Sequence, residues 1–281
     1  MPQNAIPFLT LNDGSDIPAA GFGTYKLNGQ AGVAAILSAL EAGYRLLDSA
    51  FNYENEGAVG EAVRRSGLER QELRICSKLP GRHQRGDEAI VTIEESLMRA
   101  GLDYYDLYLI HWPNPKQGLY VEAWRAMIEA QGRGLIRSIG VCNFLPEHLL
   151  TLERETGVLP SVNQIELHPY FPQDEQLAFN SAHGIATESW SPLGRGREIM
   201  DEPVVQQIAQ RLGFSGGQVV LRWHVQRGAV PIPKSADPGR QRENLSLFDF
   251  ELTPEDMQAI ATLARPNGRL KGQDPATYEE F

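Results

Sequence analysis

The feature that most constrains the fold of this sequence is a repeated alternation between short apolar runs and segments with helical periodicity. One early helix face is formed by four apolar residues: Val33, Ile36, Leu37 and Leu40. Gly43 ends this helix, and the apolar run 44–47 follows it as a strand. The same unit recurs along most of the chain. Alternating strands and helices require parallel pairing and right-handed crossovers.

The number of these strands selects the architecture. They are expected at residues 18–21, 44–47, 73–79, 105–110, 136–142, 162–165, 185–190 and 229–232. Eight is the number that a (β/α)8 TIM barrel needs, and the 281 residues fit one such domain, 1–281. The competing fold is an open doubly wound sheet. It is disfavoured because no third glycine follows Gly21 and Gly23 and because the sequence has no Walker loop.

Two segments lie outside this repeat. Residues 8–11 and 15–17, joined by Asp13 and Gly14, are typical of a β-hairpin, which we expect to cover the N-terminal end of the barrel. Residues 265–281 lack an apolar period. We expect this C-terminal tail to lie across the surface and to reach the rim of a pocket.

Charge and cysteine content limit the partners. The formal net charge of −10 argues against nucleic acid, whose phosphates require a basic surface. Cys76 and Cys142 stand in apolar runs without metal-ligand spacing, which is typical of structural thiols in a reducing compartment. No signal peptide and no apolar stretch of about 20 residues is present. We therefore expect a cytoplasmic protein without a membrane partner.

Polar side chains stand where the predicted strands end. They are Asp48, Lys78, His111, Asn143, Glu166 and Lys234, and Tyr53 follows the first of them in a short loop. Each has a simpler explanation, since a lone lysine usually reaches solvent and an aspartate often caps a helix. In a barrel, however, Asp48, Tyr53, Lys78 and His111 come from neighbouring strands and converge at the end where active sites form.

This set suits the protonation of an oxygen. An ammonium about 4 Å from a phenol favours the phenolate by roughly 4 kcal/mol at an effective dielectric constant of 20, or about three pKa units. On this argument Lys78 brings the pKa of Tyr53 towards neutral while Asp48 keeps Lys78 charged. His111 can donate a hydrogen bond to a substrate oxygen. The set holds no metal cluster and no evident nucleophile, so it fits a carbonyl that is reduced by a nicotinamide hydride.

Four motifs together resemble those of the aldo-keto reductases over essentially the whole chain. They are residues 43–56, 107–113, 139–144 and 232–235, the last followed by Arg240, Glu243 and Asn244. The short loops and residues 112–115 are most similar to bacterial members such as the 2,5-diketo-gluconate reductases. The resemblance implies a monomeric enzyme that reduces small aldehydes and ketones with NADP(H) and binds no metal.

The resemblance also implies roles for individual residues. Tyr53 is the implied proton donor, tuned by Asp48 and Lys78, and His111 orients the carbonyl. The implied NADP-binding residues are Gly23, Thr24, Asp48, Cys142, Asn143, Gln164, Trp190, Ser191, Pro192, Leu193, Gly194, Lys234, Ser235, Arg240, Glu243 and Asn244. Among these, Asn143 and Gln164 take the carboxamide, Trp190 stacks on the nicotinamide, and Lys234, Ser235 and Arg240 hold the 2′-phosphate. The expected substrate-binding residues are Phe22, Tyr25, Phe51, His111 and Trp112.

Two departures from the family and two other functions need to be considered. The family usually has serine where this chain has Cys142, and often tyrosine where it has Trp190. Lys78 could instead act as the nucleophile of a Schiff-base aldolase, which would require it to be neutral. A non-catalytic NADP-binding subunit that senses redox state is the other alternative. The sequence does not identify the natural substrate.

Overall fold

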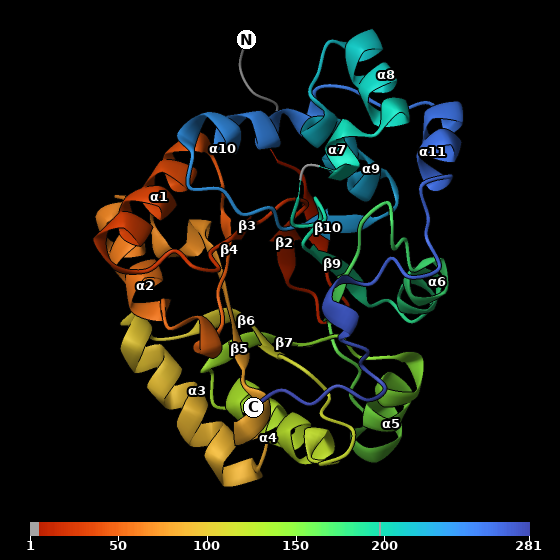
Figure 1. Cartoon of the computed structure of the whole chain (residues 1–281). Helices are drawn as coiled ribbons and strands as arrows, with labels where there is room; N and C mark the ends of the chain where they lie inside the picture. Colours follow the sequence, from red (N-terminus) through yellow and green to blue (C-terminus); the bar gives the residue numbers. More distant parts are fainter. Residues whose placement is uncertain (1–5, 197) are drawn as a thin grey trace.

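The computed structural model describes residues 6–196 and 198–281 and contains the expected barrel (Figure 1). Eight parallel strands form its sheet: β3 (Phe22–Gly23), β4 (Leu46–Asp48), β5 (Arg74–Leu79), β6 (Tyr105–Ile110), β7 (Ile136–Cys142), β8 (Val162–Glu166), β9 (Ala186–Trp190) and β10 (Ala229–Pro231). Hydrogen bonds from Gly21 N to Pro231 O (3.0 Å) and from Gly23 N to Pro233 O (3.1 Å) join the two edge strands and close the ring.

Helices surround the sheet and connect its strands. They are α1 (Gly29–Ala42), α2 (Glu56–Arg65), α3 (Gly86–Ala100), α4 (Tyr120–Gly132), α5 (Pro146–Thr156), α6 (Asp174–Ala182), α7 (Glu198–Asp201), α8 (Pro203–Leu212), α9 (Gly216–Gln226), α10 (Pro238–Leu245) and α11 (Pro254–Ala261). Gly60 shows how closely neighbouring helices approach, because a Cβ atom there would lie 1.7 Å from the carbonyl oxygen of Ala100 at the end of α3. Only glycine fits at that contact. Among the described residues, no helix is long and apolar enough to cross a membrane.

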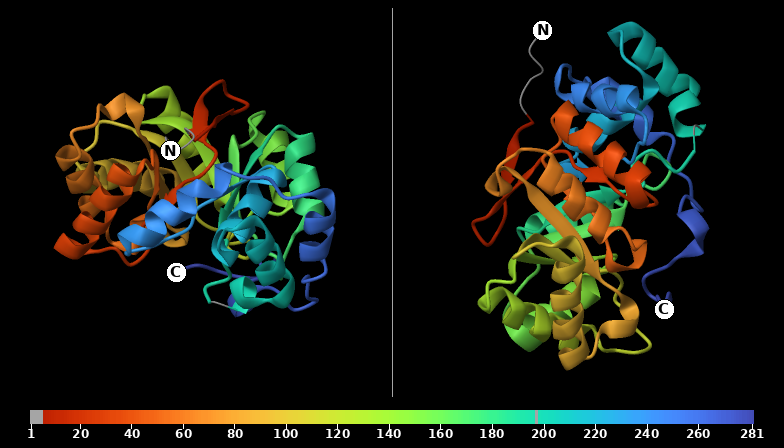
Figure 2. Two further views of the ribbon diagram at one scale, coloured as in Figure 1. Left: turned by 90° about the horizontal axis from the view of Figure 1, so that it is seen from above. Right: turned by 90° about the vertical axis from the view of Figure 1, so that its left-hand side faces the viewer.

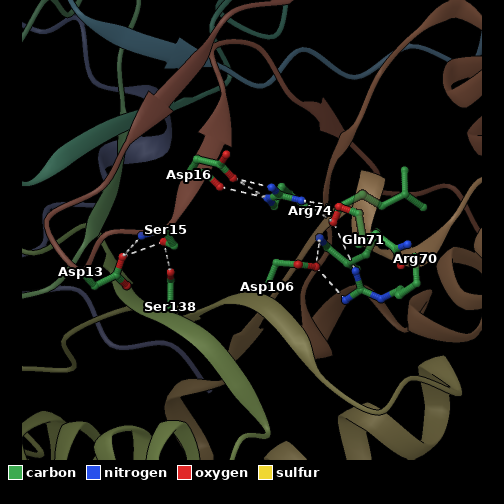
Figure 3. Close-up of polar contacts among 10 residues, drawn as sticks. Asp13, Ser15, Asp16, Arg70, Gln71, Arg74, Asp106 and Ser138 are labelled. Carbon is green, nitrogen blue, oxygen red and sulfur yellow. Dashed lines mark hydrogen bonds and ion pairs between the residues drawn. The ribbon is translucent and has the colours of Figure 1, made fainter.

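A hairpin of β1 (Phe8–Thr10) and β2 (Asp16–Pro18) covers one end of the barrel, as the sequence predicted. Leu11 and Ile17 pack into the apolar barrel interior. Figure 3 shows the polar contacts at this end: Asp16 pairs with Arg74 at the start of β5, and Ser15 lies 2.5 Å from Ser138 of β7. The hairpin and the end of the tail lie on opposite ends of the barrel (Figure 2).

The main differences from the sequence prediction lie after β9. The helices α7, α10 and α11 were not predicted. The start of α11 had a readable signal, since Thr253 and Asp256 form a capping box around Pro254. At the other end of the chain, Pro18 belongs to the hairpin and not to the first barrel strand, which consists of β3.

Candidate active site

The four expected catalytic residues come from three adjacent strand ends. Asp48 is the last residue of β4, Lys78 stands near the end of β5, and His111 follows β6. Tyr53 ends the short helix η1 (Phe51–Tyr53), which follows β4. Because β4, β5 and β6 are parallel neighbours, their C-terminal ends place these side chains at one end of the barrel.

Lys78 and Asp48 form a buried ion pair at the floor of the site. The Nζ atom of Lys78 lies 2.6 Å from Oδ1 of Asp48 and donates to the carbonyl oxygen of Ser49 at 2.6 Å. The Lys78 side chain has 0% exposure. Burial alone would lower the pKa of Lys78, but Asp48 and then Tyr53 outweigh it and hold this pKa well above its ordinary value. Lys78 is therefore a charged donor and not a neutral nucleophile.

Tyr53 lies directly above this pair, with Nζ of Lys78 5.1 Å from the centre of its ring. The sequence argument that Lys78 brings the pKa of Tyr53 towards neutral is wrong for this structure. Burial raises the pKa of the Tyr53 phenol above its ordinary value, because it exceeds the lowering effect of Lys78, and Asp48 opposes that effect further. Lys78 still favours the phenolate, and Asp48 offsets part of that effect, so the net upward shift comes mainly from burial.

The C-terminal tail supplies a carboxylate that the sequence did not indicate. Oε1 of Glu280 lies 2.7 Å from Nδ1 of His111. The same carboxylate accepts hydrogen bonds from Asn52 Nδ2 and from the Gly81 backbone N–H, each at 2.8 Å. Burial raises the pKa of Glu280, but the His111 contact and these donors outweigh burial, so the net shift is downward. The tail thus reaches past the rim and into the catalytic centre.

A second hydrogen-bonded chain runs beneath the pocket, inside the barrel. Nε2 of Gln164 donates to Oδ1 of Asp48 at 2.8 Å and to Oε2 of Glu188 at 2.9 Å. Glu188 on β9 is fully buried, and burial followed by the nearby Asp48 charge raises its pKa to about 7. Both amide hydrogens of Gln164 are therefore used inside the barrel, which leaves its oxygen for the pocket.

A pocket of about 590 Å³ opens above these residues. Its walls include most of the expected site: Gly23, Tyr25, Asp48, Tyr53, His111, Trp112, Cys142, Asn143, Gln164, Trp190, Ser191, Pro192, Leu193 and Lys234. Trp190 Nε1 donates to Asn143 Oδ1 at 2.8 Å, and Asn143 Nδ2 donates to the carbonyl oxygen of His111 at 3.1 Å. Asn143 and Ser191 both have positive φ angles, 63° and 50°, a strain that often accompanies functional sites.

Several expected site residues do not line this pocket. Phe22 is fully buried in the core against Tyr44, with ring centres 5.2 Å apart. Phe51 packs against the imidazole of His83 and the guanidinium of Arg99. Both were expected to contact substrate, but neither side chain lines the pocket. Strand alternation explains Phe22, because its neighbour Gly23 faces the pocket and successive residues point to opposite faces.

Among the expected cofactor residues, Thr24 and Gly194 also lie outside the pocket wall. The Thr24 hydroxyl donates to the backbone oxygen of Asp48 at 2.8 Å, which makes it a support for the catalytic strand. Ser235, Arg240, Glu243 and Asn244 lie beyond Lys234, on α10 and the loop before it.

Lys234 lines the pocket and Arg240 lies on α10, and both side chains are exposed. Across residues 6–196 and 198–281, neither side chain has a carboxylate partner. The backbone N–H of Arg240 donates to Asp237, which caps the N-terminus of α10 at 2.8 Å. Two unpaired positive charges near a helix N-terminus can bind a phosphate group.

Other residues of the pocket were missed by sequence reasoning. The guanidinium of Arg195 lies 5.8 Å from the ring centre of Tyr25 and 5.7 Å from that of Trp190. Lys26 and the tail residues Lys271, Gln273 and Tyr278 also line the pocket. Arg195 was missed because the loop after β9 has no periodic apolar pattern. The tail residues were missed because only the folded chain brings them to the pocket.

Comparisons with known proteins agree with this geometry. A sequence profile described as the Aldo/keto reductase family matches residues 19–265. The chain is 55% identical to 2,5-diketo-D-gluconic acid reductase B of a Corynebacterium species, over 98% of this chain and 99% of that protein. It is 45% identical to methylglyoxal reductase DkgA of Escherichia coli, over 96% of this chain and 97% of that protein.

Solved structures give the same result. A mutant of Gox0644 in complex with NADPH superposes with a TM-score of 0.93 at 40% identity, covering 98% of this chain and 100% of that chain. A Bombyx mori aldo-keto reductase in complex with NADP superposes with a TM-score of 0.90 at 34% identity, covering 98% of each chain.

Proposed function

The chain belongs to the aldo/keto reductase family and is an NADP(H)-dependent oxidoreductase, and from this premise we propose that it reduces small polar aldehydes and ketones with Tyr53 as the proton donor. The observation that carries the assignment is the stacked arrangement of Tyr53 above the buried Lys78–Asp48 pair, beside His111 at the pocket floor. A site that only binds a cofactor does not need a phenol held in this way.

In the proposed reaction, bound NADPH supplies the hydride that reduces the carbonyl carbon. Tyr53 donates its phenolic proton to the oxygen as negative charge develops there. The raised pKa of Tyr53 keeps the phenol protonated over the working pH range, and an alkoxide is basic enough to take its proton. His111 positions the oxygen, while the charged Lys78 stabilises the phenolate that remains after transfer.

The amides of the pocket fit a nicotinamide carboxamide. Gln164 presents its oxygen, because Asp48 and Glu188 accept both of its amide hydrogens. The Oδ1 atom of Asn143 accepts from Trp190, and one hydrogen on its Nδ2 is donated to the carbonyl oxygen of His111. The second Nδ2 hydrogen remains as a donor. One acceptor and one donor complement the NH2 and the oxygen of a carboxamide. Trp190 provides an aromatic face on which the ring can stack.

The phosphate end of the pocket fits NADP better than NAD. Arg240 and Lys234 would hold the 2′-phosphate, which is close to a dianion and suits a guanidinium and an ammonium. Ser235 would add a neutral donor, and Glu243 and Asn244 would contact the adenine. Because the two cations lack carboxylate partners in the described part of the chain, no internal ion pair has to be broken when the phosphate binds.

The two alternative functions receive less support. A Schiff-base aldolase would need a neutral, accessible Lys78, but this side chain is buried, charged and paired with Asp48. No observation favours a redox-sensing subunit.

The direct test is the oxidation of NADPH with a panel of carbonyl compounds, followed by the loss of reduced-nicotinamide absorbance. The panel should include 2,5-diketo-gluconate and methylglyoxal, because the similar proteins are named for these substrates. We expect turnover of several small polar carbonyls. Binding of NADPH without turnover of any compound would contradict the proposal and favour the non-catalytic alternative.

A further inference from the structure

The C-terminal tail, dark blue in Figure 1, brings a positive charge to the pocket that the proposed reaction does not use. Lys271 belongs to the short helix η5 (Leu270–Gly272), lines the pocket and has an exposed side chain. Among residues 6–196 and 198–281, its ammonium has neither a carboxylate partner nor a hydrogen-bond acceptor. The structure therefore leaves the charge of Lys271 without an internal counterion in the part of the chain that it describes.

The carboxylates of the pocket wall already have other partners. Within the described chain, this wall contains two of them, Asp48 and Glu280. Asp48 accepts from Nζ of Lys78 at 2.6 Å, and Glu280 accepts from the Gly81 N–H at 2.8 Å. An anionic group that neutralises Lys271 would therefore come from a bound ligand.

The turn that carries Lys271 is held on both sides. The Leu270 N–H donates to Oε1 of Glu166 at the end of β8, at 2.6 Å. Nη1 of Arg269 spans the turn and donates to the carbonyl oxygen of Gln273 at 3.3 Å. Lys271 itself has a φ angle of 56°, in the left-handed region that non-glycine residues rarely adopt. The fold thus fixes the backbone of this lysine at the strand ends and directs its side chain to the pocket.

The position of Lys271 associates it with the substrate and not with the cofactor phosphates. The other cations that line the pocket are Lys26, Arg195 and Lys234, which follow β3, β9 and β10. Lys271 instead belongs to the tail, which continues to the proposed catalytic residues. Tyr278 packs on Trp112 with ring centres 4.5 Å apart, and Oε1 of Glu280 lies 2.7 Å from Nδ1 of His111.

We propose that the carbonyl substrate carries a carboxylate and that Lys271 is the specificity-determining residue that receives it. The inference rests on the proposed function and deepens it. It also separates the compounds for which the similar proteins are named, because a diketo-gluconic acid is an anion at neutral pH and methylglyoxal is neutral. The competing explanation is that Lys271 is a solvated surface charge, as most exposed lysines are.

The test compares carbonyl substrates that differ in charge but hardly in shape. Two such pairs are D-glucuronate with D-glucuronamide and para-carboxybenzaldehyde with para-carbamoylbenzaldehyde. We expect the wild type to prefer the acids. Lys271→Met should lower kcat/KM for the acids by about 3- to 10-fold, mainly through KM, between the effects of an exposed ion pair and of a charged hydrogen bond. The amides should change less than about twofold.

Two further measurements test the ionic nature of the contact. Lys271→Arg should retain the preference for the acids, because it keeps the positive charge. The preference of the wild type should shrink at high salt. Fluorescence titration with NADPH should give nearly the same affinity in the wild type and in Lys271→Met. Weaker NADPH binding, with equal losses for acids and amides, would show that Lys271 contacts the cofactor and would overturn the inference.

Lys116→Met is the matched control, because it removes the same charge beside the tail. The Lys116 N–H donates to Glu279 at 2.7 Å, and its side chain is exposed outside the pocket wall. We expect acids and amides to be reduced as by the wild type. An equal acid-specific loss in Lys116→Met, or no acid-specific loss in Lys271→Met, would overturn the inference and leave the proposed function intact. Failure of the wild type to reduce any carbonyl compound would overturn the proposed function itself.

Discussion

The Lys78–Asp48 pair and the cations Lys234 and Arg240 are in opposite environments. At the ends of β4 and β5, Lys78 is fully buried and its charge is satisfied by Asp48 and by the Ser49 carbonyl oxygen. At the end of β10 and on α10, Lys234 and Arg240 are exposed, and neither has a carboxylate partner in the described part of the chain.

On the proposed function, the difference separates residues that hold the site together from residues that would contact the cofactor. Leaving one member of a buried pair without its partner typically destabilises a protein by about 3–5 kcal/mol. Exposed charges contribute little to folding, with a median near 0–1 kcal/mol even when they are paired. Changes to Lys78 or Asp48 should therefore affect chemistry and stability together, whereas changes to the proposed phosphate-binding cations Lys234 and Arg240 should affect only cofactor binding.

The largest effect is expected at Tyr53. Tyr53→Phe removes the acidic oxygen and keeps the ring above Lys78, so kcat should fall by about 10²–10⁴-fold, the usual contribution of general acid catalysis. NADPH binding should be retained. Steady-state reduction of several aldehydes measures the loss, and Tyr104→Phe, which alters a tyrosine beside Arg70 instead, serves as the control. Near wild-type kcat in Tyr53→Phe would show that another group is the proton donor.

Lys78→Met should reduce stability as well as activity. It leaves the Asp48 carboxylate buried without its cation, so the free energy of unfolding should fall by about 3–5 kcal/mol. Asp48→Asn in the same chain removes the unpaired charge and should restore part of that loss. Urea denaturation of the single and double variants measures both effects. Equal free energies of unfolding for Lys78→Met and for the double variant Lys78→Met/Asp48→Asn would contradict the view that the unpaired Asp48 charge causes the loss.

Glu188→Gln tests the lower layer of the floor through pH. The ordinary pKa of 4.5 is raised to about 7 in the folded protein, so the unfolded chain loses this proton first. Protonated Glu188 makes its full contribution to the free energy of unfolding below about pH 4.5, and this contribution is lost as pH rises through about 7. From this shift, the variant should gain up to about 3 kcal/mol relative to the wild type between pH 4.5 and pH 8.

Urea denaturation of the cofactor-free protein at several pH values measures this gain. Glu41→Gln, which changes an exposed carboxylate on α1, is the control. A parallel pH dependence in wild type and Glu188→Gln would show that Glu188 is ionised at neutral pH and that its position beneath Asp48 is not destabilising.

The catalytic floor was largely predictable, because local sequence determines where strands end. An apolar run that stops at Asp48, Lys78 or His111 predicts a polar side chain at the mouth of a parallel barrel. The pKa of Tyr53 was not predictable. Its sign depends on how many protein atoms surround the phenol and on how fully Asp48 neutralises Lys78, and both are properties of the folded structure.

The C-terminal tail and the segment after β10 show what the sequence could not predict. Glu280 contacts His111 although 169 positions of sequence separate the two residues. No periodic pattern in a sequence predicts such a contact. The helix α10 was missed because its eight residues are mostly polar or charged and lack a clear apolar face. Phe22 was assigned to the pocket from its residue type, whereas the alternation of β3 directs it into the core.

The smallest expected effect is also the most selective, and it concerns Arg240. The proposed contact joins its guanidinium to the 2′-phosphate of NADP, and hydrogen bonds to charged groups are worth about 1.5–3 kcal/mol. Arg240→Ala should therefore weaken NADPH binding about 10- to 150-fold, at roughly 1.4 kcal/mol per decade. NADH lacks this phosphate, so its affinity should barely change. The free energy of unfolding should also stay close to that of the wild type, because the side chain is exposed and unpaired among the described residues.

The matched control is Arg242→Ala. Arg242 is exposed on the same helix, but a separation of two residues turns it about 200° around the axis, away from Arg240. Fluorescence titrations of NADPH and NADH into the wild type and both variants, at low and high salt, make the comparison. The Arg240 effect should shrink at high salt because the contact is ionic. If Arg240→Ala weakens both cofactors equally, or if Arg242→Ala matches it, the exposed cations act as a general positive field and Arg240 does not recognise the phosphate.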